Sequence, residues 1–384
     1  MGDAVARRAQ RAAIPTALPV LPGLHVDAEY ASMKARGVGR TWFDVLALAD
    51  GRAAMLVGDV LHPDIPSAAV AGRVRPILAQ LLSESHDLVP VLEQVNQQLR
   101  MQDERYATSA CMTIVDPSDG RIEYGTCGHA PPLIVEPLGG TRHLPPTGGG
   151  ALGLDLPVAA ATGRLGRDGV LVLSSGITRQ ARAEVALRLA GLSQDPDAST
   201  ATPGGGGQPA RTAAVCHAAT EVIRRTDRRG GLAVLAAQHR PAVPRLKLSV
   251  PAIAANVDTV REAVGNWLFG LRSSVEDGAG MTLAVGEATA NAVQHAYVGG
   301  HVGTVTVEAS LQSDGELACW VRDDGRWLSP ELSTTSRPGR GLAIMARLCD
   351  RVKVSREGSG TVVELRRRLH HPVIRSGTGA LSEV

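Results

Sequence analysis

Three polar residues near the C-terminal end of the chain have the spacing of one helix face. Glu287, Asn291 and His295 follow one another at intervals of four in GEATANAVQH, so a helix over 281–297 places them on the same side. An amide oxygen is a hard ligand that suits Mg²⁺, and a carboxylate one turn away can accept a proton from an attacking hydroxyl group. Taken alone, the triplet is also typical of a solvated helix face.

Two later stretches have the residue types of a nucleotide site. VRDDG ends a predicted strand at Asp323, whose carboxylate can accept a hydrogen bond from an exocyclic amine, and Gly325 allows a flat ring to approach the backbone. PGRGLAIMARL runs from Gly339 and Gly341 into a predicted helix, whose free N–H groups attract phosphate. Each stretch is common by itself. Found together in one chain, in this order and at this spacing, they are specific to a nucleotide site.

Residues from about 246 to 368 therefore resemble the histidine-kinase/gyrase-type ATPase fold, and most closely its anti-sigma-factor serine kinases. GEATANAVQHA matches the first box, VRDDG the adenine box, GRGLAIM the glycine box and GSGTVVEL the closing strand. The short lid over 328–340 is similar to that of the anti-sigma kinases. No phosphoacceptor-histidine helical hairpin precedes the domain, which argues against a sensor kinase.

The resemblance implies a role for each matching residue. Glu287 would be the catalytic base, Asn291 would hold Mg²⁺ against the ATP phosphates, and Asp323 would read adenine. The implied ATP-binding set is Asn291, Asp323, Gly325, Gly339, Arg340, Gly341, Leu342 and Thr361. One departure is Trp327, which stands where the family has a second glycine and could either crowd the nucleotide or stack beside it.

In the N-terminal half, Asp59 ends the apolar strand AAMLVGDV, where a metal ligand could stand. The residues that follow, Leu61-His62-Pro63-Asp64, are bulky and include no glycine that would let the loop close around an ion.

GTCGHAPPLIVEP, together with TWFDVLALADGRAAMLVGDV and GVLVLSSGITR, resembles the bacterial sporulation-type serine/threonine phosphatases. The match runs from about Arg11 to Arg240. It implies an αββα sandwich whose relatives hydrolyse phosphoserine on small antagonist proteins with a water that bridges two Mn²⁺ or Mg²⁺ ions. That chemistry needs several carboxylates, because two neighbouring dications repel unless anionic ligands neutralise them.

Most of these ligands are missing from the matching positions. Arg40-Thr41 replaces the family's Gly-Asp, Ser174-Ser175-Gly176 its Thr-Asp-Gly, and Gly230-Gly231 its Asp-Asp. Asp59 is then the remnant of a metal site, and we expect the Mn²⁺ or Mg²⁺ of this domain to be lost. Asp44 and Asp64 are the candidates that could compensate. His129 is expected to have a structural role in the turn before Pro131.

Length and composition fit this division. A chain of 384 residues is too long for one ordinary core. We predict an α+β protein, in which a two-layer α/β sandwich follows the αββα sandwich. The expected parts are a tail over 1–10, a phosphatase-like domain over 11–240 with a flexible Gly-rich insertion over 193–210, an ATP-binding domain over 246–370, and a disordered tail over 371–384.

Charge and apolar content exclude several classes of partner. The net charge of +2 is spread evenly, which argues against nucleic acid and anionic membranes. No apolar run has the length of a membrane span, and the N-terminus has no signal-peptide core, so we expect a cytoplasmic protein. Five scattered cysteines fit reduced thiols.

The leading hypothesis is a partner-switching regulator. Its ATP-binding domain would phosphorylate a serine or threonine of an anti-sigma-factor antagonist, or sequester a sigma factor, beside a pseudophosphatase domain. Two alternatives stay open: a bifunctional protein whose phosphatase still works, and a binding module that ATP gates without phosphoryl transfer. Homodimers are plausible for both families, and the sequence does not decide on them.

Overall fold

The computed structural model describes residues 14–31, 40–62, 65, 67–85, 87–102, 106–192, 211–226, 231–296, 303–325, 340–357 and 360–376. The chain divides into two compact units, and each is described by itself. Unit 1 comprises Met1–Pro241 and Pro372–Val384, and unit 2 comprises Ala242–His371. No helix in the described part of the chain is both long and apolar enough to cross a bilayer.

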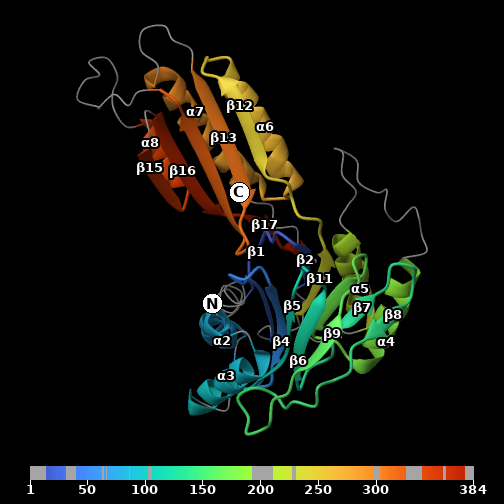
Figure 1. Cartoon of the computed structure of the whole chain (residues 1–384). Helices are drawn as coiled ribbons and strands as arrows, with labels where there is room; N and C mark the ends of the chain where they lie inside the picture. The colour runs from blue at the N-terminus through green and yellow to red at the C-terminus, as the bar shows by residue number, and fades with distance from the viewer. Residues whose placement is uncertain are drawn as a thin grey trace, which may run out of the picture. The chain divides into compact units, whose positions relative to one another are not determined.

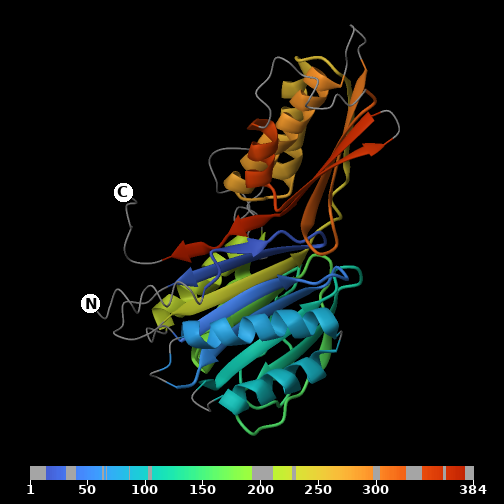
Figure 2. The same cartoon turned by 90° about the vertical axis from the view of Figure 1, so that its left-hand side faces the viewer.

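Unit 1 is a sandwich of two sheets with helices on both outer faces (Figure 1). One sheet has the order β3-β4-β5-β6-β9 and is covered by α2 and α3, the blue and cyan helices in Figure 2. Its elements are β3 (Thr41–Ala47), β4 (Ala53–Val60), α2 (Ser67–Glu84), α3 (Leu88–Gln102), β5 (Thr108–Val115), β6 (Arg121–Cys127) and β9 (Ala161–Arg164). Because both faces of this sheet are covered, β4 and β5 are apolar along almost their whole length.

The second sheet has the order β18-β2-β11-β10-β7-β8, and α4 and α5 pack on its outer face. Its elements are β2 (Leu24–Ala31), β7 (Leu133–Val135), β8 (Thr141–His143), β10 (Val170–Ser175), α4 (Arg179–Leu192), α5 (Arg211–Thr226), β11 (Leu232–His239) and β18 (Ile374–Ser376), and a short strand β1 (Ala17–Pro19) precedes them. Leu171 and Leu235 point into the core between the sheets, and Val172 and Val234 point toward the helices. The αββα sandwich expected from the sequence is therefore confirmed.

The end of the chain differs from the prediction. A disordered tail was expected from 371, but Ile374–Ser376 forms β18, which pairs in parallel with the edge strand β2. The Ser376 hydroxyl also donates to Glu29 Oε1 at 2.7 Å. Three residues are too few to give a strand signal in the sequence, because the pairing depends on the exposed edge of β2.

Unit 2 is a two-layer sandwich, with the helices on one side of a single sheet (Figure 2). The sheet has the order β12-β13-β14-β16-β15. The elements are β12 (Leu246–Pro251), α6 (Asn256–Gly270), α7 (Val275–His295), β13 (Thr304–Leu311), β14 (Glu316–Asp323), α8 (Arg340–Leu348), β15 (Arg351–Glu357), β16 (Gly360–Arg368) and β17 (His370–Pro372). Buried and partly exposed residues alternate along β13, as one covered face requires. This confirms the predicted architecture.

Helix α7 begins six residues before the predicted start at 281. Its N-cap is Ser274, whose side chain accepts a hydrogen bond from the Asp277 N–H at 3.0 Å. Gly278 and Gly280 have low helix propensity, so the sequence pattern predicts a helix start that is too late. The Asp277 carboxylate lies 2.5 Å from Arg367 Nη2 and accepts the His370 N–H at 2.8 Å, so it ties the helix to the end of the sheet.

We predict that Asp277→Asn lowers the free energy needed to open the first turn of α7 by about 3 kcal/mol. The substitution leaves the Arg367 guanidinium without its buried anionic partner. Burial opposes ionisation of Asp277, but hydrogen bonds from His370 and Arg367 lower its pKa from 3.8 to about 2. A depressed pKa contributes stability above pH 4, and this stability is lost as the pH falls toward 2.

Hydrogen exchange of the α7 amides measures the change. The matched control is Asp258→Asn, because the Asp258 side chain is 85% exposed and its pair with Arg261 contributes little. Equal protection in both variants would contradict the role given to Asp277.

Candidate functional site

The first turn of α8 lies directly against the polar face of α7. A Cβ atom added to Gly341 would lie 3.1 Å from the Asn291 side-chain nitrogen and 3.5 Å from Glu287 Oε2. A side chain at this position would therefore crowd Asn291, and glycine leaves the helix start room to approach. The structure thus brings together the carboxylate, the amide and the N–H groups of a helix N-terminus, three groups that suit a metal-bound phosphate.

Arg261 of α6 joins this cluster, and sequence reasoning missed it. Its Nη2 lies 3.7 Å from Glu287 Oε1, and its Nε is buried without a hydrogen-bond partner. A Cβ at Gly286 would lie 2.3 Å from the Arg261 Nε, so this glycine allows the guanidinium to cross α7. The glycine directly before Glu287 was the only signal in the sequence, and it needed the pairing of α6 with α7 to be interpreted.

The other end of the site is built by two neighbouring strands. Asp323 ends β14, and β16 runs antiparallel beside it. Asp323 Oδ1 accepts the N–H groups of Gly325 at 3.1 Å and of Thr361 at 3.2 Å. The Thr361 hydroxyl also stabilises this carboxylate. Burial raises the pKa of Asp323, although these two N–H groups oppose the shift.

Glycines also fix the backbone around Asp323. A Cβ at Gly360 would lie 1.8 Å from the Asp323 carbonyl oxygen, and one at Gly325 would lie 2.2 Å from the Ala296 carbonyl oxygen. The strand end is thereby packed against both β16 and the end of α7. A carboxylate at the end of a strand, beside glycine backbone that carries no side chain, can accept from the amine of a flat heterocycle.

Some predicted residues cannot be placed. Gly339, Trp327 and the rest of the lid lie outside the described residues, as do the side chains of Arg340 and His295. Leu342 is described, and its side chain is half exposed in the first turn of α8.

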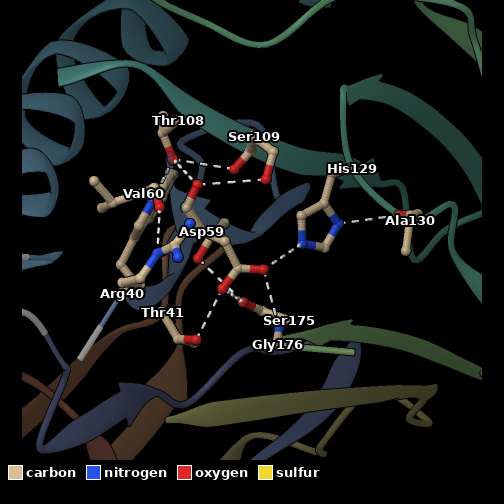
Figure 3. A network of polar contacts seen from close by, with 12 residues as sticks. Arg40, Thr41, Asp59, Val60, Thr108, Ser109, His129, Ala130, Ser175 and Gly176 are labelled. Atoms are coloured by element: carbon tan, nitrogen blue, oxygen red, sulfur yellow. Dashed lines mark hydrogen bonds and ion pairs between the residues drawn. The ribbon is translucent and has the colours of Figure 1, made fainter. Parts of the chain in front are cut away.

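In unit 1, Asp59 lies at the centre of a network of protein hydrogen-bond donors (Figure 3). Thr41 Oγ1 and Ser175 Oγ lie 2.8 and 2.7 Å from Asp59 Oδ1, and the Gly176 N–H donates to Oδ2 at 3.0 Å. Thr41 and Ser175 stand where the phosphatase resemblance expects metal-binding carboxylates. Two hydroxyl groups thus donate to one oxygen of Asp59, and a backbone N–H donates to the other.

A histidine and an arginine border the same network. His129 Nε2 lies 3.6 Å from Asp59 Oδ2, so this residue does more than shape the turn before Pro131. Burial opposes ionisation of Asp59, but His129, Gly176 and Ser175 lower its pKa from 3.8 to about 2. Arg40 donates from Nε to the Val60 carbonyl at 2.8 Å, which places a positive charge at this strand end.

The residues around Asp59 do not fit a pair of dications. Thr41 pairs with Asp59 across β3 and β4, so Asp44, three residues further along β3, points to the opposite face. There the Asp44 carboxylate pairs with Arg75 Nε at 2.5 Å, and it cannot compensate for the missing ligands. Asp64 lies outside the described residues. Within the described ranges, no three His, Cys, Asp or Glu side chains are grouped as a metal site requires.

We predict that Gly341→Ala lowers the affinity for Mg·ATP by about tenfold, because the added methyl group displaces the Asn291 amide. Titration calorimetry measures the affinity. Gly270→Ala is the control, since a Cβ there has no atom within 4 Å. Unchanged affinity in Gly341→Ala would show that the cluster of Gly341, Asn291 and Glu287 does not bind the nucleotide.

Comparisons with known proteins agree with this geometry. Residues 250–367 match the family described as Histidine kinase-like ATPase domain, and residues 49–229 match Stage II sporulation protein E (SpoIIE). The anti-sigma F factor of Halalkalibacterium halodurans is 31% identical over 138 residues, which cover 32% of this chain and 92% of that protein. The anti-sigma F factor of Heyndrickxia coagulans is 29% identical over 136 residues, which cover 33% and 92%.

A solved structure resembles nearly the whole chain. The crystal structure of the RsbU and RsbW domains of a Mycobacterium tuberculosis protein has a TM-score of 0.79 and 27% sequence identity, and the match covers 94% of this chain and 99% of that one. The chain therefore belongs, through unit 2, to the anti-sigma F factor family of histidine kinase-like ATPases, and unit 1 is a SpoIIE-type phosphatase domain.

Proposed function

We propose that unit 2 is a Mg·ATP-dependent kinase that phosphorylates a serine or threonine of an antagonist protein. The observation that carries the proposal is the contact of Gly341 with Asn291 and Glu287, which puts a base, an amide oxygen and a helix N-terminus in one place. The similarity to anti-sigma F factors supports it, because that name describes regulators of sigma factors.

Each residue of the site would have one role in phosphoryl transfer. The Asn291 amide oxygen would hold Mg²⁺, the N–H groups of α8 would bind the phosphates, and the Asp323 carboxylate would accept from the adenine amine. Bound Mg²⁺ supplies positive charge that neutralises the phosphate oxygens. Glu287 accepts the proton of the attacking hydroxyl, whose oxygen forms a bond to the γ-phosphorus while the bond to the bridging oxygen breaks and ADP leaves.

Arg261 would act as a positioning residue for Glu287. Arg261 Nη2 and Glu287 Oε1 are 3.7 Å apart, so the cation can hold the carboxylate in place.

We predict that Glu287→Gln abolishes label transfer from γ-labelled ATP to the antagonist, while the Kd for Mg·ATP changes by no more than about threefold. Glutamine keeps the size of the side chain but cannot accept the proton. Glu276→Gln, in the first turn of the same helix, is the control and should keep full transfer.

If neither the wild type nor the control transfers label to any candidate antagonist although ATP binds, unit 2 is a nucleotide-gated binding module. The same antagonists and a sigma factor, tested for complexes that need ATP, then identify the partner.

We further propose that unit 1 is a pseudophosphatase, a fold that holds a phosphoprotein or partner without hydrolysing it. The support is the hydrogen bonding of Asp59: its oxygens accept from Thr41, Ser175 and Gly176. Arg40 adds a cation where a metal centre would need anions. A working phosphatase is the rival function.

We predict that Asp59→Ala destabilises unit 1 by about 2 kcal/mol, because the buried donors lose their charged acceptor. The stability that Asp59 contributes to the wild type is present above pH 4 and is lost as the pH falls toward 2, since its pKa is depressed. Denaturant unfolding measures both effects. Asp155→Ala, whose side chain is 84% exposed, is the control.

A phosphatase assay with Mn²⁺, on the same wild-type and variant proteins, tests the rival function. The wild type should hydrolyse p-nitrophenyl phosphate no faster with Mn²⁺ than without it. Turnover that Mn²⁺ stimulates and Asp59→Ala abolishes would show a working phosphatase.

A further inference from the structure

A cavity of about 550 Å³ lies in unit 1 between α4 and the edge strand β8, away from the Asp59 network. Thr141, His143, Arg179 and Arg182 form its polar side. Leu187 and three alanines of α4 form an apolar wall. The volume falls in the range of pockets that hold small organic ligands, and a mostly apolar lining with a few convergent polar groups is typical of such sites.

The positive charge in this cavity is not balanced by the residues that the structure describes. Arg179 and Arg182 stand in the first turn of α4, where the helix dipole is itself positive, and this turn has no acidic residue. Neither arginine forms an ion pair with any residue in the described part of the chain. Arg182 Nε is buried and has no hydrogen-bond partner. A buried donor without an acceptor costs stability, so this arrangement favours an anion from outside.

Two acidic side chains, one on α4 and one between β7 and β8, pair with other residues. Glu184 Oε1 accepts from Gln180 at 3.3 Å, and Glu136 pairs with Arg142 at 3.4 Å. Burial and the charge of Arg182 lower the pKa of His143, so its ring adds a neutral polar group beside the two guanidinium groups.

We propose that this cavity binds a small organic phosphate monoester, with the phosphate between Arg179 and Arg182 and its organic group against Leu187. Guanidinium groups bind phosphate oxygens in pairs, and a dianion suits two cations at a helix N-terminus. The apolar side chains of the wall can contact an organic group on the phosphate, which inorganic phosphate does not have. The site is separate from the ATP site of unit 2 and does not depend on the kinase proposal.

The test is a calorimetric titration of the full chain with phenyl phosphate, with saturating Mg·ADP present to fill the nucleotide site. We expect binding that Arg182→Met weakens by about tenfold, because a charge-assisted pair of hydrogen bonds is lost. Arg188→Met removes the same charge from the same helix outside the cavity, and its affinity should stay within about twofold of the wild type.

Further measurements separate the two halves of the proposal. Inorganic phosphate should bind more weakly than phenyl phosphate, and Leu187→Ser should reduce that difference. Bound phosphate offsets the charge of Arg182, so the pKa of His143, followed by NMR, should rise when phenyl phosphate is added.

Arg179→Met keeps the test valid if Arg182→Met fails to fold, because Arg179 is exposed. Absence of binding at millimolar phenyl phosphate would overturn the proposal, and so would equal affinities in the cavity and control variants. Tight binding of inorganic phosphate with no gain from the phenyl group would overturn the assignment of an organic ligand.

Discussion

A carboxylate or amide oxygen serves an external ion or ligand only through lone pairs that the protein's own donors leave free. This constraint separates the two units. In unit 1, hydroxyl and amide donors surround both oxygens of Asp59. In unit 2, both backbone N–H groups that bind Asp323 donate to one oxygen, Oδ1, and the cation beside Glu287 is 3.7 Å away, too distant for a close hydrogen bond. The same residue types therefore support different chemistry in the two units.

Glycine makes the open site of unit 2 possible. Gly341 lets a helix N-terminus reach Asn291, Gly286 lets Arg261 cross to Glu287, and Gly360 lets β16 pack on the end of β14. A Cβ atom would overlap the Asp323 backbone at Gly360, would force Arg261 to move at Gly286 and would crowd Asn291 at Gly341. The geometry is thus set by backbone approach, which holds polar groups in place before a nucleotide arrives and reduces the cost of ordering them on binding.

The sequence predicted what depends on local pattern and on family motifs: the two sandwiches, the helix face of Glu287 and Asn291, and the strand end at Asp323. It could not predict contacts between distant segments. Arg261 and His129 reach their acidic partners across 26 and 70 residues of chain. The start of α7 was missed because Gly278 and Gly280 hide a helix that Ser274 and Asp277 stabilise. The side of the sheet on which Asp44 lies was predictable, because strand residues alternate between faces.

The most direct measurement is an anomalous difference map from crystals of the full chain grown with Mn²⁺ and a non-hydrolysable ATP analogue. The account predicts a manganese peak beside Asn291 with the nucleotide phosphates, and no peak within coordination distance of Asp59. Two well-occupied peaks beside Asp59, or a nucleotide bound without any ion near Asn291, would contradict it.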